Sequence, residues 1–113
     1  MSGDWVEICD ADDVEPDDVI GVTRDGVDYA IYRSADGRYF ATDGHCTHEQ
    51  VLLCDGLVID GVIECPKHNG RFGYTTGAAL GVPVTIDLRT YPTRVVDGVV
   101  SIDRSTTGGA DDR

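Results

Sequence analysis

Apolar and polar residues alternate over short stretches of this chain, and no long stretch has the spacing of an amphipathic helix. The dipeptide Asp-Gly occurs six times. It favours two-residue turns between antiparallel strands because both of its positions tolerate a positive φ. The pattern therefore predicts an all-β protein. Its short apolar runs predict strands over residues 4–9, 19–23, 27–33, 38–42, 57–59, 62–64, 84–88, 93–96 and 99–103.

Two segments lack this pattern. Residues 10–18 contain six acidic side chains together with Pro16, so we expect a solvent-exposed loop there rather than a helix. Residues 104–113 are rich in Ser, Thr, Gly and charged side chains, which can bury little apolar surface. We expect these residues to form a disordered tail. Residues 1–103 are enough for one domain with a single core.

Four residues that commonly bind metals are grouped in two pairs. Cys46 and His48 are separated by one residue, and after a gap of sixteen residues Cys65 and His68 follow in the order Cys-Pro-Lys-His. Structural zinc sites usually begin with two cysteines two to four residues apart and end with two histidines. In this chain each half of the motif is mixed. Such a set can instead hold a two-iron cluster, in which one iron binds both sulfurs and the other binds both imidazoles.

The motif and its surroundings resemble the Rieske [2Fe-2S] ferredoxins, in particular the small ferredoxins of bacterial ring-hydroxylating and demethylating oxygenases. The resemblance implies an antiparallel β-sandwich with a small cluster-binding subdomain, about residues 44–84, at one tip. It extends over roughly residues 4–103 and includes Asn69-Gly70-Arg71-Phe72, Thr76-Gly77, Gly81-Val82-Pro83 and Tyr91-Pro92.

The resemblance also implies a role for each of the four ligands. Cys46 and Cys65 would be the inner, shielded ligands of a single [2Fe-2S] cluster. His48 and His68 would lie near solvent, where an electron can leave. The segment at 81–83 would cover the cluster, although Gly and Pro geometry alone also explains a turn at this place.

The residues around the ligands predict a low reduction potential. High-potential members of the family carry an extra cysteine pair and Ser and Tyr hydroxyls that donate to sulfur. The matching positions here are Val51, Lys67, Gly70 and Phe72. With fewer hydrogen bonds the reduced, more negative state is less stabilised, so we expect the low end of the Rieske range, about −150 mV. Gly73 stands where the family often has Asp.

The chain cannot also build the active site of a Rieske oxygenase. Such a site needs two histidines and a carboxylate, and His45 is the only histidine outside the motif. No nucleotide-binding fingerprint is present. We therefore interpret the protein as an electron carrier, not an enzyme, between a flavin-dependent NAD(P)H reductase and a Rieske terminal oxygenase. The alternatives are a small Rieske-like subunit of a nitrite reductase and a zinc-stabilised interaction module.

The charge and the remaining cysteines limit the partners and the compartment. A formal charge of −12 disfavours nucleic acid and anionic membranes, and favours a partner with a basic docking patch, although a need for solubility alone also explains it. The sequence contains no signal peptide and no apolar run that could span a membrane, so we expect a cytoplasmic protein. Cys9 and Cys54 lie outside the motif, and we interpret Cys9 as an ordinary small residue of a reducing compartment. Cys54 lies between the two halves of the motif, where either an ordinary thiol or a redox-active one is consistent with the sequence.

Overall fold

The computed structural model describes residues 3–47, 51–67, 69–81, 84, 86–105 and 108–109. No helix within these ranges is long and apolar enough to cross a membrane. The helical elements are two short 3₁₀ turns, η1 (Ala11–Asp13) and η2 (Leu53–Asp55). The strands are β1 (Trp5–Asp10), β2 (Asp18–Arg24), β3 (Val27–Arg33), β4 (Tyr39–Asp43), β5 (Leu57–Ile59), β6 (Val62–Glu64), β7 (Arg71–Gly73), β8 (Arg89–Tyr91), β9 (Thr93–Val96), β10 (Val99–Asp103) and β11 (Gly108–Gly109).

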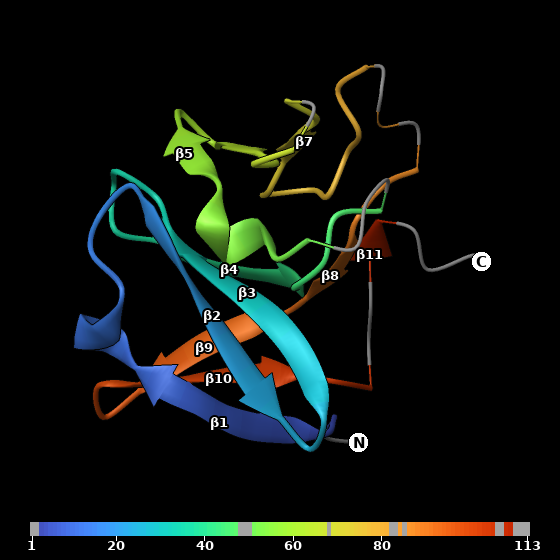
Figure 1. Ribbon diagram of the computed structural model, residues 1–113. Coiled ribbons are helices and arrows are strands. Elements are labelled where there is room, and N and C mark those ends of the chain that lie inside the picture. The colour runs from blue at the N-terminus through green and yellow to red at the C-terminus, as the bar shows by residue number, and fades with distance from the viewer. Residues whose placement is uncertain are drawn as a thin grey trace.

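The strands form three antiparallel sheets (Figure 1). One sheet has the strand order β1-β10-β9, and a second has the order β11-β8-β4-β3-β2. These two sheets form the sandwich. The short strands β5, β6 and β7 form a third sheet at one end of the molecule, away from β1 and β10. The predicted all-β class is therefore confirmed.

Strand β3 lies between two hydrophobic cores and contributes side chains to both. Its side chains point alternately to opposite faces, so that Tyr29 and Ile31 pack into one core while Ala30 and Tyr32 pack into the other. The sandwich core consists of Ile8, Val14, Tyr29, Ile31, Ala41, Val100 and Ile102. The subdomain core consists of Val19, Ala30, Tyr32, Cys46, Leu53, Val58, Ile63, Cys65, Phe72, Tyr74, Val84 and Leu88.

Three of the six Asp-Gly dipeptides form the predicted two-residue turns. Both residues have positive φ at 25–26 (54° and 79°), at 60–61 (50° and 81°) and at 97–98 (53° and 77°). These turns close the hairpins β2-β3, β5-β6 and β9-β10, whose strands pair in the expected antiparallel register. The prediction of these three hairpins is confirmed.

The prediction of a strand over residues 84–88 is wrong. Val84 makes an isolated bridge with Gly81, and the strand of this region is β8 at 89–91. Val84 and Leu88 are instead buried in the subdomain core, where their apolar side chains anchor an irregular segment. Strand β7 was not predicted from the sequence, because Arg-Phe-Gly contains a single apolar residue next to a glycine and so lacks the pattern of a strand.

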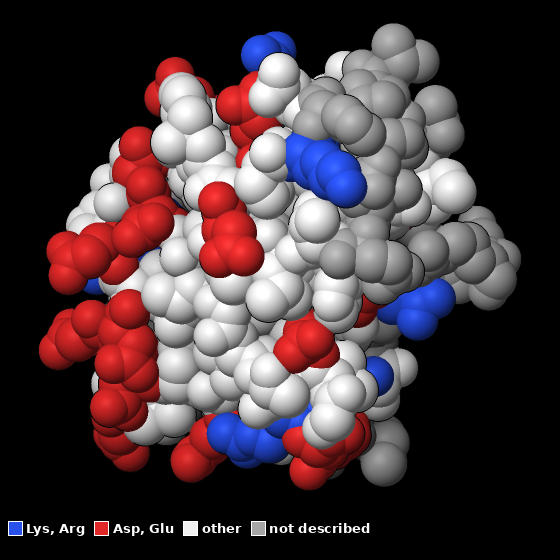
Figure 2. Space-filling model, viewed as in Figure 1, with Lys and Arg blue, Asp and Glu red and all other residues white. Residues whose placement is uncertain are grey.

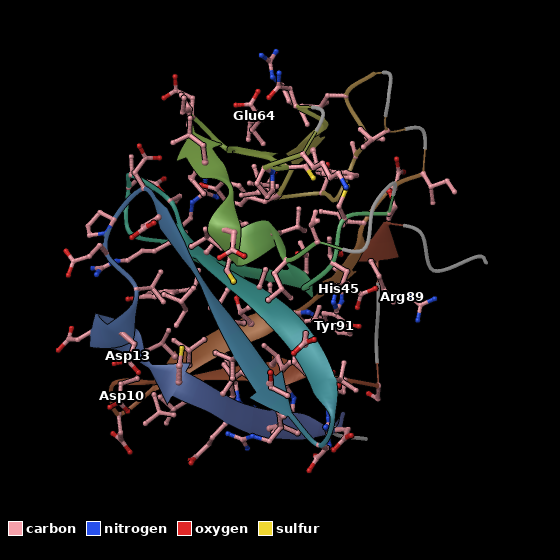
Figure 3. The ribbon with its side chains drawn as sticks, viewed as in Figure 1. Asp10, Asp13, His45, Glu64, Arg89 and Tyr91 are labelled. Carbon is pink, nitrogen blue, oxygen red and sulfur yellow. The ribbon has the colours of Figure 1, made fainter. Side chains whose placement is uncertain are left out.

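The acidic segment before β2 contains one short turn. In η1 the N–H of Asp10 donates to the side chain of Asp13 at 3.0 Å, and the two residues form a capping box (Figure 3). Val14 follows and is fully buried in the sandwich core. Val14 and two side-chain hydrogen bonds hold this mostly exposed segment: Arg33 donates to the carbonyl of Val14 at 3.2 Å, and the hydroxyl of Tyr39 donates to the carbonyl of Ala11 at 2.9 Å.

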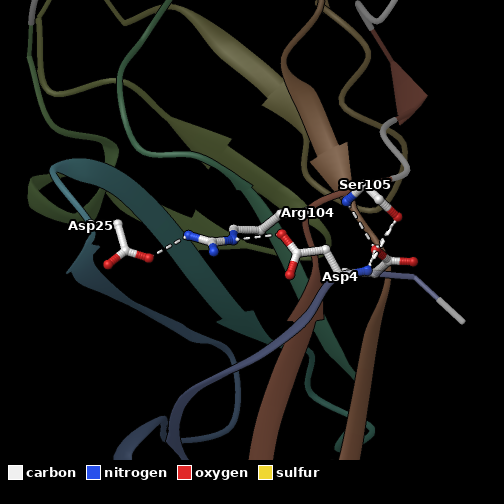
Figure 4. A network of polar contacts seen from close by, with 5 residues as sticks. Asp4, Asp25, Arg104 and Ser105 are labelled. Carbon is white, nitrogen blue, oxygen red and sulfur yellow. Dashed lines mark hydrogen bonds and ion pairs between the residues drawn. The ribbon is translucent and has the colours of Figure 1, made fainter.

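Part of the segment that was expected to be a disordered tail contacts other parts of the chain. Arg104 donates to Asp25 at 2.8 Å and lies 3.5 Å from Asp4, so it joins the β2-β3 turn to the start of the chain (Figure 4). The buried carboxylate of Asp103 accepts hydrogen bonds from the backbone of Asp4 and from Ser105. Further on, β11 pairs with β8. Residues 106–107 and 110–113 lie outside the described residues.

We expect Gly77→Ala to destabilise the fold much more than Gly61→Ala. Both glycines have a φ of +81°, so left-handed strain costs each variant about 1 kcal/mol. Only at Gly77 would the new Cβ also meet backbone, at 2.2 Å from the carbonyl oxygen of Leu88. The total loss at Gly77 should be about 3 kcal/mol or more, measured as the free energy of unfolding in urea. Equal losses in the two variants would contradict this close packing.

Candidate metal centre

Cys46 stands at the base of a loop that folds back on itself. Its N–H donates to the carbonyl of Val51 at 3.1 Å, and the N–H of Leu53 donates to the carbonyl of Gly44 at 2.8 Å. An isolated bridge pairs His45 with Leu52 in the same place. His48 belongs to this loop by sequence and lies outside the described residues.

Cys65 stands at the base of a second loop of the same construction. It follows β6, and its N–H donates to the carbonyl of Gly70 at 2.6 Å before the chain continues into β7. In both loops the cysteine N–H therefore bonds to the carbonyl five residues further along. Asn69 has a φ of +58°, which turns the chain back towards β7. His68 lies outside the described residues.

The two cysteines are buried in one apolar environment. Cys46 is 4% exposed and Cys65 is 1% exposed, and both belong to the subdomain core together with Phe72 and Leu53. Both cysteine side chains are therefore shielded from solvent. An apolar shell of this kind keeps water away from sulfur.

A third segment contacts both loops. The hydroxyl of Thr47 donates to the carbonyl of Ile86 at 2.7 Å, which ties the first loop to the chain after Val84. At the second loop, a Cβ on Gly70 would lie 2.6 Å from the side chain of Val84, so glycine is required there for close packing. Val82 and Pro83 lie outside the described residues. Sequence reasoning missed the Thr47 contact because it joins residues 39 apart.

The base of the first loop is held by polar contacts from β3 and β8. Asp28 accepts the N–H of Gly44 at its carbonyl, 2.9 Å away, and its carboxylate lies 3.6 Å from His45. The hydroxyl of Tyr91 donates to Asp43, the last residue of β4 (Figure 3). Burial and then this hydrogen bond raise the pKa of the Tyr91 hydroxyl, so it remains a donor at neutral pH. His45 therefore lies beside a carboxylate of β3.

The two cysteines outside the motif lie in different places. Cys9 is on β1 at the edge of the sandwich core. Cys54 is in η2 and packs against β2, where a Cβ on Gly21 would lie 2.7 Å from its sulfur. Burial is the main cause that raises the pKa of each thiol, with nearby carboxylates adding to it.

The donor set in the described residues fits an iron-sulfur cluster. Two soft sulfur donors are shielded in one core, and each opens a loop that carries a histidine by sequence. Between residues 3 and 109, as far as these are described, no three His, Cys, Asp or Glu side chains form a group that could hold a metal ion. His48 and His68 lie outside these described residues.

Comparison with known proteins gives the class. The sequence matches the family model of the Rieske [2Fe-2S] domain over residues 4–92, and the chain belongs to this family. Its cofactor is accordingly one [2Fe-2S] cluster of the Rieske type.

Individual relatives match this chain over most of the length of both chains. The chain is 41% identical over 105 residues to the ferredoxin component of a naphthalene 1,2-dioxygenase system from Pseudomonas putida, a match that covers 93% of this chain and all of the relative. One chain in a solved complex of reduced oxygenase and oxidised ferredoxin in carbazole 1,9a-dioxygenase also matches, with a TM-score of 0.82 and 34% sequence identity. The match covers 90% of this chain and 94% of the chain in the complex.

The structure of a nitrite reductase small subunit from Mycobacterium tuberculosis matches this chain with a TM-score of 0.81 and 24% sequence identity. The match covers 94% of this chain and 99% of the Mycobacterium tuberculosis chain. This likeness shows the fold alone.

We expect Cys9 to resist alkylation at neutral pH. Burial, with smaller contributions from Asp13 and Asp10, raises its pKa to about 11, against 9.0 for an ordinary thiol. At pH 8 its reactive thiolate fraction should be about a hundredfold lower than that of N-acetylcysteine. Peptide mapping after iodoacetamide treatment of the native protein measures the rate, which should increase steeply towards pH 11. Labelling at the rate of N-acetylcysteine at pH 8 would show that the thiol is not shielded.

Proposed function

We propose that Cys46, His48, Cys65 and His68 ligate the [2Fe-2S] cluster. The observation that carries this assignment is the pair of buried cysteines, each at the base of a loop closed by the same backbone hydrogen bond. The sequence places one histidine in each loop. When bound, the cluster accepts and releases one electron at a time. The chain supplies two sulfurs from its core and two imidazoles from its loops.

The chain supplies electron transfer rather than catalysis. We propose that it takes electrons from a flavin-dependent NAD(P)H reductase and passes them to a Rieske terminal oxygenase. The naphthalene dioxygenase ferredoxin component and the carbazole dioxygenase complex of an oxygenase with a ferredoxin support the oxygenase as a partner. Only three histidines occur in the sequence, and with His48 and His68 assigned, His45 alone cannot form a mononuclear iron site. We assign the protein to the cytoplasm, which suits the thiols of Cys9 and Cys54.

The main alternative is a subunit of a nitrite reductase. It is supported by the structural likeness to the Mycobacterium tuberculosis protein, which concerns the fold alone. Such a subunit would purify in a fixed complex with a large reductase, whereas a carrier purifies as a separate protein. A zinc-stabilised module would contain neither iron nor acid-labile sulfide, so metal and sulfide analysis separates it from both redox functions.

The assignment is tested by removing one ligand. Cys65→Ser should abolish bound iron and all NADH-dependent turnover in a mixture of reductase, oxygenase and this protein, because sulfur is the donor that the buried site offers. Cys54→Ser is the matched control, and it should retain both iron and turnover because Cys54 lies outside the two loops. Turnover in the complete absence of the protein would refute the role as carrier, and full iron content in Cys65→Ser would refute the ligand set.

We propose a midpoint potential near −150 mV and expect Phe72→Tyr to raise it. Phe72 is fully buried in the same core as both cysteines, so a hydroxyl added there enters a dry environment. One additional hydrogen bond to sulfur stabilises the reduced state by about 1 kcal/mol, or about 40 mV for one electron. Voltammetry measures the shift. A wild-type midpoint above zero would contradict the low-potential assignment.

A further inference from the structure

A second polar site lies at the opposite end of the third sheet from Cys65. It is a depression of about 250 Å³ between the segment before β2, the β3-β4 turn, the β5-β6 turn and the chain after β7. The β5-β6 turn is at the far end of β6 from Cys65, roughly 10 Å away at the rise of a strand. We call this depression the acidic notch, and its polar lining includes Asp17, Ser34, Asp36, Arg38, Asp60, Tyr74 and Thr75.

The notch carries uncompensated negative charge. Asp36 is satisfied locally, since its carboxylate lies 3.0 Å from Arg38 Nε and accepts the hydroxyl of Ser34. Asp17 and Asp60 are exposed, and their carboxylates make no hydrogen bond or ion pair within the described part of the chain. Three carboxylates and one guanidinium therefore leave a formal charge of −2 around the depression.

A buried hydroxyl faces the same depression. Tyr74 is 1% exposed, and its hydroxyl has no hydrogen-bond partner among the described residues. The ring cannot turn away, because it stacks in parallel on Tyr32 at 4.5 Å and packs against Phe40 at 5.7 Å. Burial, followed by the charges of Asp17 and Asp36, raises the pKa of this hydroxyl. It therefore remains protonated at neutral pH, and Asp17 and Asp36 line the same depression as Tyr74.

A buried polar group without a partner is costly, so the hydroxyl indicates a site that a ligand can complete. The ligand must be cationic, given the charge of the notch. It is not a single metal ion, because no three acidic, His or Cys side chains of the described residues stand close enough to share one. A guanidinium group suits the notch better, since its five N–H donors lie in one plane and can reach separate acceptors.

We propose that the acidic notch binds the guanidinium group of an arginine on a partner protein, with Asp17, Asp60 and the Tyr74 hydroxyl as acceptors. The rim is open to solvent, so one arginine binds weakly on its own and acts as an anchor within a larger contact. The chain as a whole favours such a partner: its acidic side chains gather along the edge that carries the segment between β1 and β2, at the left of Figure 2. The site is independent of the cluster and of its role in electron transfer.

The probe for this site is N-acetylarginine amide, with N-acetylcitrulline amide as the uncharged control of the same shape. The probes are titrated into the ¹⁵N-labelled full chain with its cluster bound, at constant ionic strength. We expect saturable chemical-shift changes at the amides of Asp17, Gly61 and Thr75 with arginine only. Equal changes with the citrulline probe, or none with arginine, would overturn the proposal.

Matched variants locate the binding. Asp60→Asn should weaken the arginine probe about threefold, the effect of one exposed charge pair. Asp97→Asn is the control, because it has the same charge change in the same kind of Asp-Gly turn, with a φ of 53° against 50° at Asp60. It should leave binding unchanged. If both substitutions weakened binding of the arginine probe equally, the effect would come from the net charge of the protein, and the proposed site would be wrong.

Tyr74→Phe tests the hydroxyl. It should weaken the arginine probe by a further factor of about three while leaving the melting temperature unchanged or higher, because the described residues provide no partner for the hydroxyl. Unchanged affinity in this variant would remove Tyr74 from the site. Saturable shifts of the same amides with Mg²⁺ or Ca²⁺ at lower concentration than with arginine would mean a metal site and overturn the guanidinium assignment.

Discussion

The burial of β3 on both faces is the constraint on which the rest of the structure depends. Tyr29 and Ile31 close the sandwich core on one face, while Ala30 and Tyr32 close the subdomain core on the other. A change of register by one residue would exchange the two sets and fill each core with the wrong side chains. The tight Asp25-Gly26 turn fixes that register against β2. The ligand loops are therefore positioned by a strand that contains none of the ligands.

The sandwich strands could be predicted because their signals are local. Alternation and Asp-Gly turns involve neighbouring residues, and they located the hairpins at 25–26, 60–61 and 97–98. Residues 84–88 misled the prediction, since an apolar run fits a strand as well as a buried irregular segment. Val84 and Leu88 are apolar because the subdomain core needs them, and their backbone does not join a ladder. The contacts of residues 104–105 and 108–109 involve Asp25, Asp4 and β8, which are distant in sequence.

The candidate metal centre also has features that the sequence could predict and features that it could not. The proposed ligands Cys46, His48, Cys65 and His68 were chosen by residue type and spacing, which are properties of the sequence. What holds the two loops could not be predicted: Thr47 bonds to Ile86, and Gly70 packs against Val84. The acidic notch is a further example. Asp17, Asp36 and Asp60 are ordinary acidic loop residues in the sequence, and only the fold brings them around the hydroxyl of Tyr74.

The contact of Arg104 with Asp4 and Asp25 has a practical consequence for attaching the protein to a surface. It fastens the start of the chain to the β2-β3 turn, at the end of the molecule opposite the third sheet. A short tether placed before Asp4 would thus anchor the molecule by a rigid point and not by a loose strand. On an electrode, such a tether would turn the two cysteine loops outward, towards a partner arriving from solution.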